Sequence, residues 1–191
     1  MTFAYRYLRE VQDVAGELRH DHLEKLVDEV AAVRKRGRLF IAGLGGSAAN
    51  ASHAASDLRK LAGVDAICLS DNAAELTARA NDDGWARIYA DALAASRAGR
   101  WDALLVLSVG GGTAEVSQPL VQAVEYARRK RMRVLGIVGR NGGHTKKRGH
   151  AVVVIPTVNA DRVTPHTEAF QMVVLHYLVS HPDLQRRKTK W

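Results

Sequence analysis

The sequence has 191 residues, of which 47% are hydrophobic and 25% are charged, and its 28 Lys and Arg against 20 Asp and Glu give a net charge of +8. This length suits one domain with at most a short extension, and the apolar fraction excludes a wholly disordered chain. Cys68 is the single cysteine, which excludes an internal disulfide and a zinc site built from cysteines. No apolar run approaches the roughly 20 residues of a membrane helix, and the charged N-terminus does not resemble a signal peptide. We therefore predict a soluble cytoplasmic protein.

The positive charge raises the question of a nucleic-acid partner. Basic residues cluster at 128–131, 146–148 and 186–188, where we expect a helix end, a loop and a tail that keep them solvated. Aromatic residues make up only 6% of the chain and do not interleave with these clusters, as they do in proteins that bind single strands. The pattern argues against a nucleic-acid partner and favours a field that attracts anionic substrates.

Apolar residues recur at helical spacing from Tyr5 to Lys35, which predicts one long or two consecutive amphipathic helices. Short Val, Ile and Leu runs then predict five strands, at 39–42, 66–69, 103–107, 134–138 and 152–155. Helical patterns lie between and after them, at 48–62, 73–80, 85–98, 114–130 and 164–180.

Five apolar strands that alternate with helices favour a doubly wound, five-stranded parallel sheet of the flavodoxin-like kind, with an N-terminal helical extension. We expect residues 1–37 to form a helical segment outside this sandwich, because its apolar stripe needs a partner that a second copy of the chain can supply. Residues 38–184 form the α/β domain, and residues 185–191 form a frayed basic tail.

The first glycine-rich loop, Gly43 to Ser47, lies between a predicted strand and a predicted helix. Its spacing fits neither the dinucleotide-binding G-x-G-x-x-G motif nor a P-loop. Gly45, Gly46 and Ser47 can still supply free N–H groups and a hydroxyl at a helix start, which suits an anion. An ordinary tight turn explains the same residues equally well.

The second glycine-rich loop, Ser108 to Thr113, follows the third predicted strand. Ser108 and Thr113 supply hydroxyls, while Gly110 and Gly111 allow close approach of the backbone. Because the carboxyl ends of parallel strands meet at one edge of the sheet, two such loops there favour a phosphorylated ligand.

Four residues with ligand-capable side chains lie on two predicted helices. His53 and Asp57 are four residues apart and share a helix face, where they can hold a metal or transfer a proton together. Glu168 and His176 are eight residues apart, which is about 12 Å of helical rise, so both do not automatically reach one ion. An exposed ion pair and a hydrogen-bonded histidine at the edge of the core are the plain alternatives.

The run Gly43-Leu44-Gly45-Gly46-Ser47-Ala48-Ala49-Asn50-Ala51-Ser52-His53 resembles the opening signature of the sugar isomerase (SIS) domain family. More narrowly, it is similar to the bacterial phosphoheptose isomerases, and the resemblance continues through Asp71-Asn72, Asn81-Asp82, 108–116, 136–143 and the last helix. It implies isomerisation of sedoheptulose 7-phosphate to D-glycero-D-manno-heptose 7-phosphate by a homotetramer with active sites between subunits, often with zinc.

The resemblance also implies roles for individual residues. The family's His and Glu on the helix after the first loop correspond to His53 and Asp57, and its Gln and His on the last helix correspond to Glu168 and His176. Asp57 and His176 are then the catalytic acid/base pair, and all four residues hold a divalent metal, expected to be zinc. Ser47, Ser108, Thr113 and the loop N–H groups would hold the phosphate, and Asp82 would contact sugar hydroxyls.

Two other functions remain open at this point. The chain departs from the family in Asp57, which is one methylene shorter than the usual Glu, and in the Ser108–Thr113 loop, which lacks two of the usual hydroxyls and one amide. These departures suit a non-catalytic protein that binds a sugar phosphate or a replication initiator. They also suit an isomerase of another phosphorylated sugar.

Overall fold

The computed structural model describes residues 1–188, and its centre is a five-stranded, wholly parallel sheet in the order β2-β1-β3-β4-β5. The strands are β1 (Leu39–Ala42), β2 (Ala66–Cys68), β3 (Ala103–Ser108), β4 (Arg133–Val138) and β5 (Ala151–Val154). The α-helices are α1 (Phe3–Glu17), α2 (His20–Arg34), α3 (Gly46–Asp57), α4 (Ala73–Asp82), α5 (Ile88–Ala95), α6 (Gln118–Arg129), α7 (Gly143–Arg148) and α8 (Val163–Ser180). This strand order is that of a flavodoxin-like doubly wound sheet, so the predicted fold class is confirmed.

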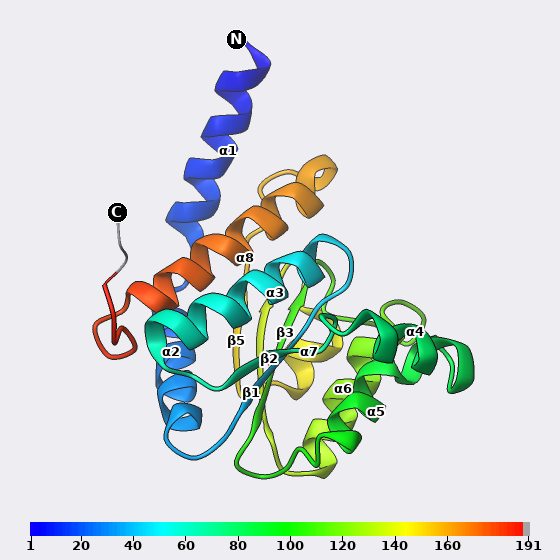
Figure 1. Ribbon diagram of the computed structural model, residues 1–191. Coiled ribbons are helices and arrows are strands. Elements are labelled where there is room, and N and C mark those ends of the chain that lie inside the picture. The colour runs from blue at the N-terminus through cyan, green and yellow to red at the C-terminus, as the bar shows by residue number, and fades with distance from the viewer. Residues whose placement is uncertain (189–191) are drawn as a thin grey trace.

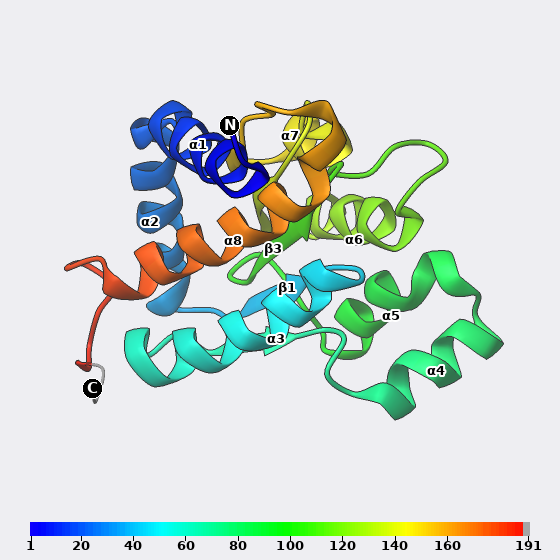
Figure 2. The same ribbon diagram turned by 90° about the horizontal axis from the view of Figure 1, so that it is seen from above.

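Helices cover both faces of the sheet, as Figures 1 and 2 show. α2, α3 and α8 pack on one face, and α5 and α6 pack on the other. The central strand β3 is buried along its whole length, which explains why it has no polar alternation in its sequence.

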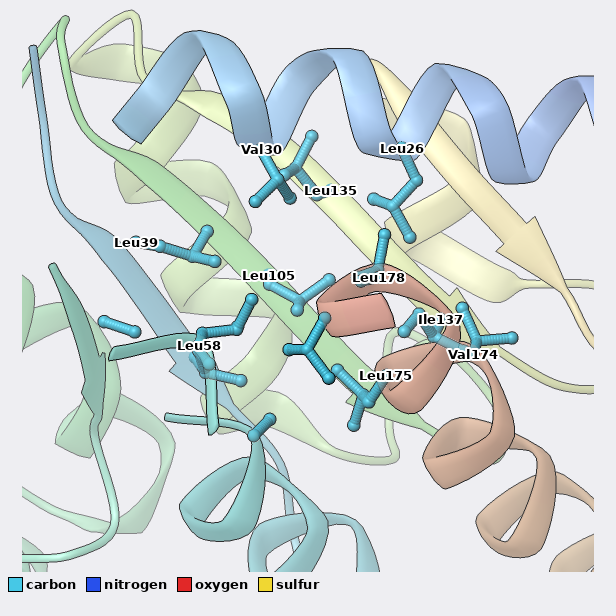
Figure 3. Packing of buried hydrophobic residues seen from close by; sticks show 14 of the residues in the cluster. Leu26, Val30, Leu39, Leu58, Leu105, Leu135, Ile137, Val174, Leu175 and Leu178 are labelled. Carbon is cyan, nitrogen blue, oxygen red and sulfur yellow. The ribbon is translucent and has the colours of Figure 1, made fainter. Parts of the chain in front are cut away.

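The larger core lies between the sheet and the α2–α3–α8 face, and Figure 3 shows its centre. Leu26 and Val30 of α2, Leu105 of β3 and Leu175 and Leu178 of α8 meet there, each at most 2% exposed. Truncating one such leucine to alanine costs about 2–5 kcal/mol of stability in proteins generally. This core fixes α3 and α8 side by side over the sheet.

The expectation that residues 1–37 lie outside the sandwich is wrong for α2. Leu26, Val27, Val30 and Val33 of α2 are buried in the larger core, against the sheet. α2 is therefore a structural layer of the domain, and the division at residue 37 follows no packing boundary.

α1 does project from the body, as Figure 1 shows. Of its residues only Val14 is buried, whereas Phe3, Tyr5 and Leu8 are 51–61% exposed. An apolar helix face that solvent reaches is typical of a surface that another chain covers.

Three segments differ from the predicted elements. α6 begins at Gln118, four residues later than expected, because the hydroxyl of Thr113 accepts the N–H groups of Glu115 and Val116 and Ser117 adopts a positive φ of 59°. The short helix α7 is unpredicted, and it contains the basic residues 146–148 that we expected in a loop. The predicted 48–62 helix ends as a π-helical turn, Leu58–Ala62.

The start of the basic tail is attached to the body, since the N–H groups of Arg186 and Arg187 donate to the carbonyl of Leu61. The rest of the predicted tail, from residue 189, lies outside the described residues. Within residues 1–188, no helix combines the length and apolar character that a membrane span requires.

Candidate functional site

A buried polar network joins the start of α3 to α8. The side-chain amide of Gln171 donates to the Ser47 hydroxyl at 3.0 Å, and Asn50 donates to Oε1 of Gln171 and to the carbonyl of Glu168, both at 2.9 Å. Ser47 is 1% and Gln171 0% exposed, so each group needs these partners. The sequence alone predicted no role for Asn50 or Gln171. A side-chain amide on the otherwise apolar face of each helix is nevertheless a signal that the two helices are joined by hydrogen bonds.

The first glycine-rich loop begins α3 in a strained backbone. Gly45 has a φ of +60°, which favours glycine, and a Cβ on Gly43 would overlap the Ser47 carbonyl. A Cβ on Gly46 would overlap the carboxylate of Glu168, which therefore lies beside the first residue of α3. A carboxylate is favoured at that position by the helix dipole, and its charge opposes the phosphate that we expected Gly45, Gly46 and Ser47 to hold.

His53, Asp57 and His176 form a cluster at the other end of α3. Nε2 of His53 lies 3.2 Å and Nε2 of His176 lies 3.9 Å from Oδ2 of Asp57. The two imidazole rings meet edge to face, with their centroids 5.4 Å apart. One ligand atom from each residue lies within 4.8 Å of the others, so a single divalent ion can reach all three.

Glu168 is not part of this cluster. α8 is an uninterrupted α-helix from Val163 to Ser180, so the eight residues between Glu168 and His176 keep their rise of about 12 Å. The structure therefore brings together three of the four expected metal ligands within one chain and places Glu168 at the start of α3 instead.

The second glycine-rich loop uses its polar groups to hold its own shape. The Ser108 hydroxyl accepts the N–H of Gly111 at 3.0 Å, and the carbonyls of Gly111 and Gly112 accept the N–H groups of Thr145 and His144 at the start of α7. Gly111 and Gly112 have φ values of +72° and +84°, which explains the glycines. The loop thus caps α7 with its carbonyls and does not begin a helix of its own.

A pocket of about 870 Å³ lies between the second loop, the start of α3 and the start of α8. Of the expected ligand-binding residues, four line it: Ser47, Ser108, Gly110 and Thr113. Gly45, Gly46 and Gly111 do not line it, and Asp82, at the exposed end of α4, accepts a hydrogen bond from its neighbour Asn81 instead.

Arg140 is the one charged residue among those that line the pocket within the described chain. It follows β4, has a positive φ of 50°, and its side chain lies against Gly110 without an ion pair to any described residue. The family resemblance includes residues 136–143, but it assigned no role to any residue of this loop. A lone cation among hydroxyls and amides suits a phosphate.

The pocket and the cluster are separate in this chain. Ser47, which lines the pocket, and Asp57 are ten residues apart on α3, which is about 15 Å of rise. α3 and α8 run side by side in Figures 1 and 2, and Thr164 of α8 lines the pocket whereas His176 joins the cluster. The same two helices therefore present recognition groups at one end and acid/base groups at the other.

Comparison with known proteins agrees with this architecture. The model of the SIS domain family matches residues 5–139. A phosphoheptose isomerase from Rhodospirillum rubrum is 32% identical over 154 residues, which is 78% of this chain and 77% of that protein. One from Helicobacter pylori is 29% identical over 154 residues, with 78% and 76% covered.

Solved structures show the same fold. The phosphoheptose isomerase of Neisseria gonorrhoeae superposes with a TM-score of 0.79 at 21% identity, over 92% of this chain and 95% of that one. The enzyme from Francisella tularensis gives 0.77 at 24% identity, over 94% and 97%. The chain belongs to the SIS domain family and is related to the phosphoheptose isomerases.

Proposed function

We propose that the protein is a cytoplasmic aldose–ketose isomerase that converts sedoheptulose 7-phosphate to D-glycero-D-manno-heptose 7-phosphate. The observation that carries the proposal is the convergence of His53, Asp57 and His176 in a chain related to phosphoheptose isomerases. A carboxylate next to two imidazoles can act as the general base and general acid of an isomerisation, in which one proton moves between two carbon atoms and another between two oxygen atoms.

The reaction moves two hydrogens. Asp57 takes the proton from C1 of the ketose and returns it to C2, while His176 moves the hydroxyl proton from O1 to O2 through an enediol. Because Asp57 and His176 lie 3.9 Å apart, both can approach adjacent carbons of one substrate. His53, at 3.2 Å from Asp57, orients the carboxylate.

The cluster also fits a divalent metal, which we expect to be zinc. Two imidazole nitrogens and one carboxylate oxygen match the three protein ligands of many catalytic zinc sites, and the donor atoms within 4.8 Å of one another suit one ion. When bound there, the ion polarises the substrate carbonyl as a Lewis acid. As a ligand Asp57 would be a weaker base, so with a metal bound His53 and His176 would be its principal ligands and Asp57 would remain the base.

Arg140 and the hydroxyls of Ser108 and Thr113 would bind the phosphate. Arg140 supplies the positive charge that the glycine-rich loop lacks, and Ser108 accepts one N–H and keeps its own hydrogen free to donate. The Glu168 carboxylate beside the first residue of α3 directs the phosphate away from the first loop and toward Arg140.

The complete active site would combine the pocket of one chain with the cluster of another in a homotetramer. Two observations support this arrangement: the rise of about 15 Å between Ser47 and Asp57 on α3, and the exposed Phe3, Tyr5 and Leu8 on α1. Light scattering should show a multiple of the 20.9 kDa chain mass, and a monomer at micromolar concentration would contradict it.

The activity is tested by incubating the protein with sedoheptulose 7-phosphate and following the aldose by NMR, with and without added zinc. His176→Ala is the inactive control. Turnover in neither condition would overturn the assignment for this substrate.

A different phosphorylated sugar is the second candidate, because Arg140 and a triple-glycine loop form this pocket in place of the family's hydroxyls. A thermal-shift screen of sugar phosphates tests it, since a ligand at 100 times its dissociation constant stabilises the folded protein by about 2.7 kcal/mol. Binding of a sugar phosphate without turnover would favour a non-catalytic protein.

A further inference from the structure

Three segments of the chain concentrate its positive charge: residues 34–38, 97–102 and 128–133. Together they contain eleven Lys and Arg residues against one Asp, which is more net positive charge than the +8 of the whole chain. They lie far apart in the sequence, where 34–38 and 128–133 are basic runs and 97–102 contains only Arg97 and Arg100.

The fold brings these segments to one edge. They lead into β1, β3 and β4, which are adjacent and parallel, so they meet at the amino edge of the sheet, at its lower end in Figure 1. The N–H of Ala103 donates to the carbonyl of Arg38, and the N–H of Arg133 donates to the carbonyl of Asp102. This basic edge lies at the opposite end of the strands from the pocket that contains Arg140.

Trp101 lies in the middle of the basic edge. It is 50% exposed and lines a pocket of about 580 Å³ with Arg36, Arg97 and Arg100. The guanidinium carbons of Arg100 and Arg36 lie 4.2 Å and 5.5 Å from the centroid of its ring. Aromatic and basic side chains therefore do interleave in space, which the sequence did not reveal.

Most of these cations form no ion pair, although Asp65 also lines the pocket beside Trp101 and Arg34 donates to three backbone carbonyls. Arg38 pairs with the buried Asp102 and Arg133 pairs with Glu29, and these are the two ion pairs that the cations of the three segments form among the described residues. Asp102 accepts four hydrogen bonds, from Arg38 and from the Gly99 N–H, so it is fully engaged with its immediate neighbours.

Helix dipoles explain only part of the arrangement. Cations in the last turn of a helix are favoured, but Arg97 and Arg131 follow the ends of α5 and α6 and have positive φ values of 51° and 58°. Glycine occupies such positions at lower cost. Like charges held close together repel one another, and an anionic ligand bound among them would relieve that repulsion.

We propose that the basic edge binds single-stranded nucleic acid without sequence specificity, with phosphates on the arginines and a base stacked against Trp101. Stacking on an aromatic ring within a positively charged groove is the common mode of such binding. A duplex presents no exposed base face to Trp101, so it should bind more weakly. This activity is independent of the isomerase proposed above.

The test is fluorescence anisotropy with a labelled oligothymidylate of about 20 nucleotides and with a duplex of the same length. We expect the single strand to bind more tightly. Its affinity should fall with salt, with a slope of about −0.7 per phosphate contacted. The absence of binding at about 50 mM salt, or equal affinity for the duplex, would overturn the proposal.

Two matched pairs of variants localise the site. Arg36→Glu/Arg100→Glu should reduce the salt slope by about 1.4, the value for two lost contacts, whereas Arg6→Glu/Arg9→Glu on α1 changes the net charge equally and should leave the slope unchanged. Trp101→Ala should weaken binding and Trp85→Ala, at 53% exposure, should not. Equal losses within either pair would overturn the proposal, as would preferential binding of the wild type to anionic vesicles. Unchanged thermal unfolding confirms that each variant is folded. Trp101→Phe keeps an aromatic ring for stacking and should therefore retain binding.

Discussion

The pocket and the His53–Asp57–His176 cluster are both built on α3 and α8, yet they differ in chemistry. The pocket is lined by hydroxyls, amides and one cation, Arg140, which suits binding of a phosphate. The cluster contains a carboxylate and two imidazoles within 4.8 Å, which suits proton transfer and metal binding. In the proposed function, binding and chemistry depend on separate ends of the same pair of helices, and changes at one end should leave the other intact.

The largest effect should come from Asp57→Asn. The amide keeps the shape of the carboxylate but cannot accept the substrate proton, so turnover should fall by roughly 10²–10⁴-fold, the usual contribution of a general base. Binding of the sugar phosphate, measured by calorimetry, should remain because Arg140, Ser108 and Thr113, the groups proposed to hold the phosphate, are unchanged.

Asp57→Glu is the matched control, because it keeps the charge and restores the longer side chain of the family pattern. It should retain or raise activity. An Asp57→Asn variant with wild-type turnover would show that the carboxylate is not the base.

Complementation of two impaired variants, assayed at a low substrate concentration, would sharpen the comparison further. In an oligomer mixed from Asp57→Asn and Arg140→Gly chains, some sites receive an intact pocket from one chain and an intact cluster from the other. Activity should therefore return on mixing, provided that the site spans two chains. If the mixture is no more active than the average of its components, the site lies within one chain.

Metal binding distinguishes a three-residue site from the four-residue site that the family pattern implies. His176→Ala removes one of three donors and should lose most of its zinc in elemental analysis. Glu168→Gln should keep its zinc, since the Glu168 carboxylate lies at the α3 N-terminus. Zinc loss from Glu168→Gln would show that a second chain brings Glu168 to the metal.

Arg140→Gly should weaken binding of the sugar phosphate by roughly 10–100-fold, the equivalent of a hydrogen bond to a charged group at about 1.5–3 kcal/mol. Its thermal stability should not decrease, because glycine adopts the φ of 50° more easily than arginine does. Arg97→Gly on the opposite edge of the sheet makes the same backbone change and should leave sugar-phosphate affinity unaltered. Equal weakening by both would assign the effect to overall charge.

The sequence predicted the fold and the acid/base groups through different signals. Apolar runs such as 103–107 reveal buried parallel strands directly, and the spacing of His53 and Asp57 places them on one helix face. The approach of His176 to Asp57 came from the family resemblance, because periodicity alone cannot show which helices pack together.

What the sequence missed depends on backbone conformation and on contacts between distant segments. α7 has six residues, too short for its periodicity to be recognised. The position of Arg140 depends on its positive φ in the loop after β4, and an arginine in the sequence does not predict that conformation. The position of Glu168 follows from the register between α8 and α3, which the Ser47–Gln171–Asn50 network fixes.

The smallest expected effect concerns Glu10, which attaches α1 to the start of α8 near the pocket. Its carboxylate accepts hydrogen bonds from Arg162 at 2.7 and 2.8 Å, from His166 at 2.8 Å and from Asn159 at 2.8 Å. Arg162 first and then His166 hold the pKa of Glu10 well below its usual range. The stability that these contacts contribute is therefore fully present above the unfolded pKa of about 4.3 and is lost as the pH falls through the folded pKa.

Glu10→Gln should lower the thermal midpoint at neutral pH, because it removes the charge that Arg162 and His166 bind. The difference from the wild type should shrink as the pH falls below about 4.3, since the carboxyl then takes up a proton in the unfolded chain before it does so in the folded protein. Glu17→Gln, at an exposed position of α1, is the control and should show no such trend.

Since Thr164 lines the pocket and His176 does not, Glu10→Gln should weaken sugar-phosphate binding slightly and leave zinc content unchanged. A gap in thermal midpoint that stays constant with pH would show that the Glu10 contacts do not depend on its charge.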